Sequence, residues 1–141
     1  ACVWGMAGGE FTLRRTKART FVPLLMVLRE TGSTVTETDD TIRVARNSRP
    51  MAAEITTDPF PGFPTDLEAQ FMARMCISDG SSRISETIFE NRFMHVPELL
   101  RMGADIQVDG GIAMVRGRKV LTPAPVMATD LRASVSSRFT R

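Results

Sequence analysis

The sequence predicts an α/β (α+β) fold built from repeated units of strand, helix, strand, helix and hairpin. An internal repeat is the first observation behind this prediction, and the alternation of helical and extended patterns within each copy is the second. The third is composition, because 141 residues with 43% apolar and 24% charged side chains suit one folded domain with a buried core.

The repeat relates two parts of the chain by an offset of 71 positions. At this offset apolar residues fall on apolar residues and glycine falls on glycine, namely Leu28 on Leu99, Gly32 on Gly103, Val35 on Ile106 and Val44 on Val115. Since matching patterns favour matching structures, we expect the two copies to superpose.

Each copy opens with an amphipathic helix. In the first copy the apolar residues follow the spacing of one helix face, at Phe21, Leu24, Leu25 and Leu28. The second helix begins at Val96, ends before Gly103 and is about one turn shorter than the first. Pro23 and Pro97 suit the first helical turn, where a missing N–H needs no partner.

A β-hairpin follows each helix. The expected strands cover residues 34–38 and 41–44 in the first copy and residues 105–109 and 112–115 in the second. The turn Gly110-Gly111 is a strong hairpin signal, whereas Asp39-Asp40 is a weaker one.

A second pair of matching segments extends the repeat. Strands are expected at residues 52–57 and 124–128, and each is followed by a similar pentapeptide, at residues 65–69 and 129–133. The first copy inserts residues 58–64, which hold three prolines and a glycine and therefore form a stiff loop.

The pentapeptides place an aspartate at the start of a helix. Thr65 and Glu68 have the spacing of a capping box, so Asp66 is expected in the first turn of a helix that runs to about Ser78. Asp130 takes the same place in the second copy. Either the two aspartates only favour a helix N-terminus through the backbone dipole, or they belong to a site at a junction of strand and helix.

Residues 86–94 combine polar and apolar side chains. A strand is expected over residues 82–88, after Gly80 ends the preceding helix. The segment then alternates apolar Ile88, Phe89 and Phe93 with polar Glu90, Asn91 and Arg92. Such a mixture is typical of a small-molecule pocket, and equally of an ordinary loop with a buried aromatic pair. Arg92 and Arg132 are suited to a phosphate or carboxylate, or are simply surface arginines.

Several classes of protein are excluded by what the sequence lacks. The net charge of +2 comes from scattered residues, so neither nucleic acid nor a membrane is expected as a partner. The longest apolar run, residues 21–28, is far shorter than the roughly 20 residues of a membrane span, and residues 1–9 do not resemble a secretory signal. The chain is therefore expected to be cytoplasmic.

Cysteine and histidine chemistry is also not indicated. Cys2 and Cys76 cannot form a disulfide framework, and His95 has no companion ligands for a structural zinc site, so no metal or cofactor is expected. Cys76 is interpreted as a buried core thiol, and His95 as a residue at the entry of a helix.

Three long segments carry a family resemblance. Residues 58–72 (DPFPGFPTDLEAQFM), 86–105 (ETIFENRFMHVPELLRMGAD) and 124–134 (APVMATDLRAS) resemble the UDP-N-acetylglucosamine 1-carboxyvinyltransferases, which are enolpyruvyl transferases. A looser resemblance extends back to about Glu10. The family resemblance implies a fold of two domains, each an inside-out α/β barrel of three similar units. This chain covers part of one such domain. We assign residues 1–9 as unmatched, 10–134 as a partial domain with units at 10–57 and 58–134, and 135–141 as a divergent tail.

The resemblance also implies a reaction and residues that perform it. The family transfers enolpyruvyl from phosphoenolpyruvate to the 3-hydroxyl of UDP-N-acetylglucosamine in peptidoglycan precursor synthesis. Asp66 matches the aspartate that faces the attacking hydroxyl as general base. Ile88 matches the apolar residue beside the nucleotide-sugar, and Arg92, Asp130 and Arg132 match charged residues of the cleft.

The family's catalytic lysine, its loop with a reactive cysteine and a late arginine find no match in this sequence. We therefore expect the chain, as a fragment of the enzyme, to be inactive alone, and both self-association and a complementing chain stay open as ways to complete it. The alternative is a non-catalytic binding or assembly module that retains the fold and self-associates.

Overall fold

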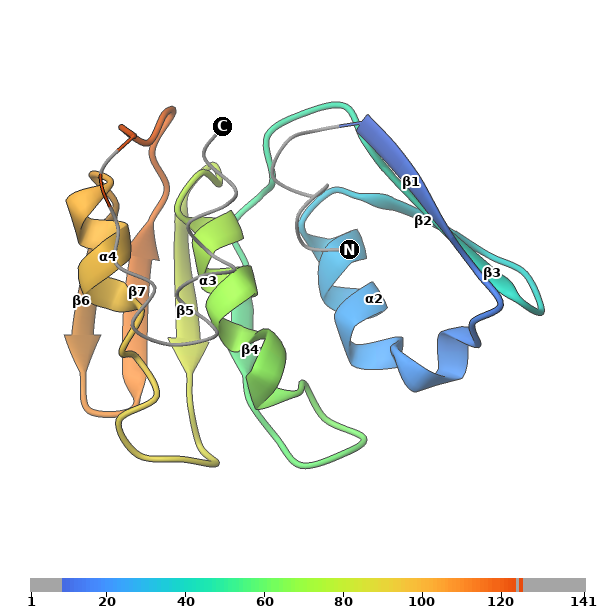
Figure 1. Ribbon diagram of the computed structural model, residues 1–141, viewed down its shortest axis with the longest axis horizontal. Coiled ribbons are helices and arrows are strands. Elements are labelled where there is room, and N and C mark those ends of the chain that lie inside the picture. The colour runs from blue at the N-terminus through green and yellow to red at the C-terminus, as the bar shows by residue number, and fades with distance from the viewer. Residues whose placement is uncertain (1–8, 124, 126–141) are drawn as a thin grey trace.

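A computed structural model describes residues 9–123 and 125, and within them seven strands form two sheets (Figure 1). In chain order the elements are β1 (Gly9–Arg14), the short helix η1 (Ala18–Thr20), α2 (Val22–Glu30), β2 (Thr34–Glu37), β3 (Thr41–Arg46), β4 (Glu54–Thr56), η2 (Thr65–Leu67), α3 (Glu68–Met75), β5 (Ser81–Ser85), α4 (Val96–Arg101), β6 (Asp105–Asp109) and β7 (Ile112–Arg116). The sheet orders are β1-β3-β2 and β4-β5-β7-β6.

The four-stranded sheet and helices α3 and α4 form one complete repeat unit, which begins at β4, inside the range 10–57 expected for the first unit. Its elements run β4, α3, β5, α4, β6 and β7, which is the predicted order of strand, helix, strand, helix and hairpin. Strands β4 and β5 are parallel, so the chain needs the α3 crossover to join them. All other strand pairs of the two sheets are antiparallel.

The two copies share one strand register. Val35 pairs with Val44 in the first sheet, and Ile106 pairs with Val115 in the second, as the offset of 71 requires. The same offset carries the β1–β3 pairs onto the β5–β7 pairs, so β1 is the counterpart of β5. Strand β1 was not predicted, although its apolar residues alternate.

The helices open the two copies as predicted. Helix α2 has nine residues and α4 has six, and both carry proline in the first turn. Their last residues, Glu30 and Arg101, coincide at the offset of 71. The second copy therefore lacks the first turn of the helix, which confirms the shorter second helix.

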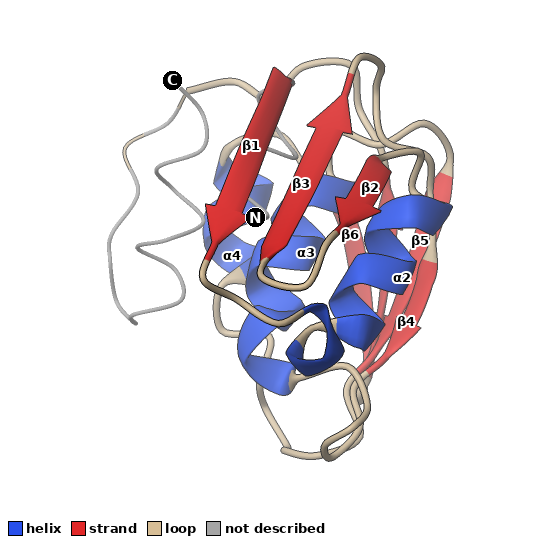
Figure 2. Ribbon diagram, turned by 90° about the vertical axis from the view of Figure 1, so that its right-hand side faces the viewer, coloured by secondary structure: helices blue, strands red, loops and turns tan. Residues whose placement is uncertain are grey.

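The helices lie on the inner sides of the two sheets. Figure 2 shows the β1-β3-β2 sheet in front of the helices and the other sheet behind them. Phe71, Met72 and Met75 of α3 are fully buried, as are Ile84 of β5 and Val115 of β7. This arrangement, with sheets outside and helices inside, agrees with the expected inside-out barrel.

The structure corrects the predicted capping box. Residues Thr65–Leu67 form a 3-10 turn, and α3 begins only at Glu68 and ends at Met75. Thr65 makes no cap, because its hydroxyl donates a hydrogen bond to Glu86 instead. Asp66 thus lies in the turn that precedes the helix.

Two strand predictions were also too long. Strand β5 ends at Ser85, so Ile88 belongs to the following loop, and β4 covers only Glu54–Thr56. Residues 58–64 form the predicted loop, with a cis peptide bond between Phe60 and Pro61. The predicted second-copy strand and turn, with Asp130 and Arg132, lie outside the described residues.

Candidate functional site

A hollow of about 510 Å³ lies between the loop that follows β5 and the β6–β7 turn. Its wall consists of residues 86–93 together with Gly110 and Gly111. The predicted mixture of polar and apolar side chains therefore surrounds a concave surface, which supports the pocket interpretation of residues 86–94.

Glu86 organises this loop from the end of the strand. One carboxylate oxygen, Oε1, accepts hydrogen bonds from the backbone N–H groups of Ile88 at 2.8 Å and Phe89 at 3.1 Å. The other, Oε2, accepts the hydroxyl of Thr65 at 2.7 Å. A single buried carboxylate thus joins the pocket loop to the turn that holds Asp66.

The same hydrogen bonds keep Glu86 ionised. Burial by itself raises the pKa of a carboxyl group, but hydrogen bonds from Thr65, the N–H groups of Ile88 and Phe89, and Thr57 outweigh burial. The pKa of Glu86 therefore lies below its ordinary value of 4.5.

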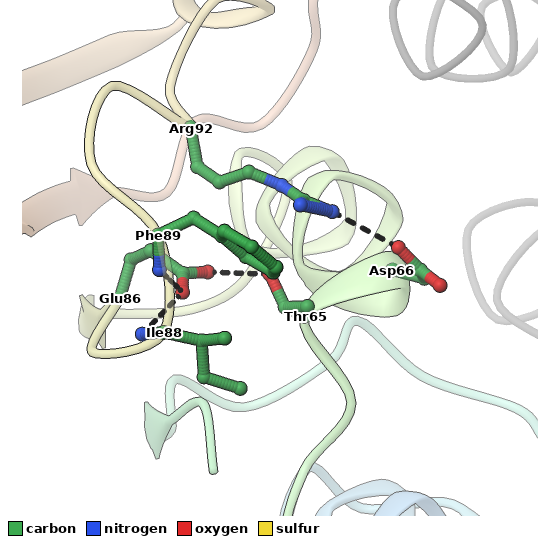
Figure 3. A network of polar contacts seen from close by, with 6 residues as sticks. All are labelled: Thr65, Asp66, Glu86, Ile88, Phe89 and Arg92. Carbon is green, nitrogen blue, oxygen red and sulfur yellow. Dashed lines mark hydrogen bonds and ion pairs between the residues drawn. The ribbon is translucent and has the colours of Figure 1, made fainter. Parts of the chain in front are cut away.

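Arg92 connects the pocket loop to Asp66. Its Nη2 donates a hydrogen bond of 3.0 Å to Asp66 Oδ1, and its guanidinium lies 4.5 Å from the centre of the Phe89 ring (Figure 3). The Arg92 side chain is 14% exposed, whereas the Asp66 side chain is 81% exposed. Packing on Phe89 therefore fixes the guanidinium, and the paired carboxylate stays open to solvent.

Two of the predicted site residues lie in the wall of the hollow, and a third lies next to it. Ile88 and Arg92 both line the hollow, but Asp66 does not. It lies beside the hollow at the far end of the Arg92 side chain. The structure thus brings Asp66 and Arg92 into contact and holds Ile88 in the same loop, while Asp130 and Arg132 lie outside the described residues.

Further hydrogen bonds connect the start of the loop to the end of β4. The N–H of Thr87 donates to Thr57 Oγ1 at 3.0 Å, and the Thr87 hydroxyl donates to the Thr57 carbonyl at 2.5 Å. The N–H of Glu86 donates to the Gly111 carbonyl at 2.7 Å. These hydrogen bonds hold the first residues of the loop against the end of β4 and the β6–β7 turn, and so fix where the loop begins.

Sequence reasoning missed the roles of Glu86 and Thr65. Both were noted, Glu86 as the first residue of a mixed segment and Thr65 as a helix cap. The available signal was an acidic residue directly after a strand whose alternate residues are buried, since a carboxylate buried at that point needs hydrogen-bond partners.

The remaining candidates behave as core residues. Cys76 is buried and unpaired, and burial raises the pKa of its thiol to about 12. His95 is 2% exposed at the start of α4, with Nε2 lying 3.3 Å from Met72 Sδ and 3.6 Å from Glu68 Oε1.

The described part of the chain holds neither a metal-binding cluster nor a membrane-spanning helix. No three His, Cys, Asp or Glu side chains of residues 9–123 and 125 gather as they do around a metal ion. Within the same residues, every helix is too short or too polar to cross a lipid bilayer.

Comparison with protein families identifies one match over most of the chain. The model of the EPSP synthase (3-phosphoshikimate 1-carboxyvinyltransferase) family matches residues 6–138. Among curated relatives, the UDP-N-acetylglucosamine 1-carboxyvinyltransferase of Methylobacterium sp. (strain 4-46) is 61% identical over 132 residues, which are 93% of this chain and 31% of the relative. The enzyme of the same name from Methylorubrum populi is 58% identical over 132 residues, which again are 93% of this chain and 31% of the relative.

Solved structures support the fold. The enolpyruvyl transferase NikO from Streptomyces tendae superposes with a TM-score of 0.80 at 21% identity, covering 99% of this chain and 34% of NikO. EPSP synthase from Acinetobacter baumannii gives a TM-score of 0.66 at 14% identity, covering 99% of this chain and 35% of that enzyme. The chain thus spans about a third of the length of the proteins it matches.

Proposed function

The chain belongs to the EPSP synthase family, and from this premise we propose that it forms part of a UDP-N-acetylglucosamine 1-carboxyvinyltransferase. The observation that carries the proposal is the contact between Asp66 and Arg92 beside the hollow. An exposed carboxylate next to a packed guanidinium suits a reaction between a sugar hydroxyl and an anionic partner.

In this proposal Asp66 is the general base. Its carboxylate takes the proton of the sugar 3-hydroxyl while the hydroxyl oxygen bonds to C2 of phosphoenolpyruvate, and C3 takes a proton from a separate general acid, a role that none of the residues named above fills. The resulting tetrahedral ketal then loses the C3 proton and phosphate, which leaves the enolpyruvyl ether. The 81% exposure of the Asp66 side chain supports this role, because the hydroxyl must reach the carboxylate.

The remaining predicted residues bind substrate in this proposal. Ile88 contacts the nucleotide-sugar as an apolar wall of the hollow, and Arg92 holds a phosphate or carboxylate through its guanidinium. The family resemblance assigns the same kind of binding role to Asp130 and Arg132, which lie outside the described residues. The reaction serves peptidoglycan precursor synthesis in the cytoplasm.

We further propose that the chain alone lacks activity. Phosphate release from phosphoenolpyruvate and UDP-N-acetylglucosamine should stay at background with the purified chain, because the family's lysine, cysteine loop and late arginine find no match here. Release that Asp66→Asn abolishes would disprove the inactivity but support the role of Asp66.

Ligand binding provides the direct test. UDP-N-acetylglucosamine should shift NMR signals of residues 66–71 and 88–93 at roughly millimolar concentration, since losing about 4 kcal/mol with the opposite wall turns a micromolar site into a millimolar one. Phosphoenolpyruvate should cause smaller shifts. Asp66→Asn should reduce the response, and Asp39→Asn, in the turn of the other sheet, should not. Shifts spread over both sheets without preference would count against the proposal.

A second candidate role is an assembly module. An apolar hollow of about 230 Å³ lies between the first sheet and α2, and its apolar lining suits an apolar side chain from a second copy of the chain, although Leu24, Leu25, Ile42 and Val44 at its base are buried. Its lining residues are Phe11, Leu13, Phe21, Leu24, Leu25, Ile42, Val44 and Leu67. Sedimentation as a monomer at high concentration would exclude this role.

A further inference from the structure

We propose that Glu86 is a positioning residue that sets the relative position of Asp66 and Arg92 through its two carboxylate oxygens. The inference rests on the proposed function, because it assigns a role to a residue behind the two side chains that the reaction needs. Glu86 contributes no proton and contacts no substrate in this scheme.

The connection runs through two short chains of atoms. On one side, Oε2 accepts the Thr65 hydroxyl at 2.7 Å, and Thr65 is the residue before Asp66. On the other side, Oε1 accepts the N–H groups of Ile88 and Phe89, and the Phe89 ring lies under the Arg92 guanidinium. The carboxylate therefore contacts Thr65, which precedes Asp66 in the sequence, and Phe89, whose ring packs against Arg92 (Figure 3).

Glu86 itself has little freedom to move. Glu86 is 7% exposed and directly follows β5, and its backbone N–H donates a hydrogen bond to the Gly111 carbonyl. Because both oxygens are engaged, a shift of the Asp66 turn is transmitted to the pocket loop. A rigid group between two functional elements holds them within the narrow range of distances that catalysis requires.

The bond to Thr65 can be removed without changing the shape of the side chain. Thr65→Val replaces the hydroxyl by a methyl group, whereas Thr65→Ser keeps the donor. Glu86→Gln removes the charge, and Glu54→Gln is the matched control, because Glu54 pairs with Arg83 on the exposed side of the neighbouring strand. Thermal unfolding of each variant establishes that it folds.

The first experiment uses the chain without ligand. In Thr65→Val, the NMR signal of the Arg92 Nε–H group and the amide signals of Ile88 and Phe89 should move, although Thr65 contacts none of these groups directly in the hydrogen-bond network. Thr65→Ser and Glu54→Gln should leave them in place. If folded Thr65→Val changes only the signals of residues 64–67, Glu86 does not couple the two elements and the inference is wrong.

The second experiment adds UDP-N-acetylglucosamine at a fixed concentration of about 2 mM, near the affinity expected for half a pocket. Shift changes in residues 88–93 should fall about tenfold in Thr65→Val and less than twofold in Thr65→Ser. Combining Thr65→Val with Glu86→Gln should reduce binding no further than the more severe single change, since the contact that Thr65→Val removes is one of those that Glu86→Gln weakens. Additive losses would overturn the inference. A wild-type chain without any response would contradict the proposed function, while the ligand-free result would still decide the role of Glu86.

Discussion

Arg92 and Asp66 are 26 positions apart in the sequence, yet Nη2 of Arg92 lies 3.0 Å from Oδ1 of Asp66. The two partners differ in environment, since the arginine side chain is 14% exposed and the aspartate side chain is 81% exposed. The arginine is held by the loop and the Phe89 ring, whereas the aspartate meets it from a separate turn. The contact therefore forms only when the segment after β4, which holds Asp66, and the segment after β5, which holds Arg92, are correctly placed relative to each other.

Asp66→Asn should leave the fold nearly unchanged. An ion pair with one strongly exposed partner contributes little to stability, so the free energy of unfolding in urea should change by less than about 1 kcal/mol. The same variant should lose most of its response to UDP-N-acetylglucosamine in an NMR titration. A large loss of stability would show that Asp66 supports the fold instead.

Gly111→Ala should damage the pocket. A Cβ atom at this position would lie 2.7 Å from the Glu86 carbonyl oxygen, which is backbone and cannot move aside easily. We expect a loss of about 1 to 3 kcal/mol in the free energy of unfolding, as in other overpacked sites. Gly110→Asn is the matched control, because φ is +57° there and no atom lies within 4 Å of a Cβ. Asparagine tolerates that conformation, so an equal loss in both variants would contradict the steric explanation.

Stability should fall in acid through Glu86. Its pKa is lowered in the folded protein, so ionised Glu86 stabilises the fold fully above the ordinary value of 4.5 and loses this effect as the pH falls through the folded pKa. Between about pH 6 and pH 3, the free energy of unfolding should decline more steeply in the wild type than in Glu86→Gln. Identical slopes would show that Glu86 is not the group responsible.

Cys76 should resist thiol reagents in the folded protein. Burial raises the pKa of its thiol to about 12, so almost no reactive thiolate exists near neutral pH. In a Cys2→Ser background, where Cys76 is the only cysteine, labelling at pH 8 should follow the rate of unfolding and become fast in denaturant. Fast labelling of the native chain would disprove the assignment as a core thiol.

The secondary structure of the repeat was largely predictable from local patterns. The hairpins at Asp39-Asp40 and Gly110-Gly111 and the helices with early prolines were confirmed, because turn residues and apolar spacing act over short stretches. Strand β1 was missed, although the offset of 71 places Phe11 and Leu13 on Ser82 and Ile84 of β5. Applying the repeat to every segment would have found it.

The candidate site was only partly predictable. Its residue types and the mixed loop at residues 86–93 follow from the sequence, and the hollow lies there. The capping box at Thr65 was wrong, because a buried carboxylate from a distant strand end competes successfully for its hydroxyl. Local rules cannot rank a helix cap against a tertiary hydrogen bond to a charged group.

The sequence by itself determined the repeat, the order of its elements and the family to which the chain belongs. Only the tertiary structure decided that Asp66 meets Arg92, that Glu86 joins their two segments, and that Asp66 stands beside the hollow and not in its wall. Helix and turn signals arise between residues a few positions apart, and the sequence displays them directly. The site contacts arise where β4 and β5 run parallel, which brings their following segments to one edge of the sheet and depends on how the whole unit packs.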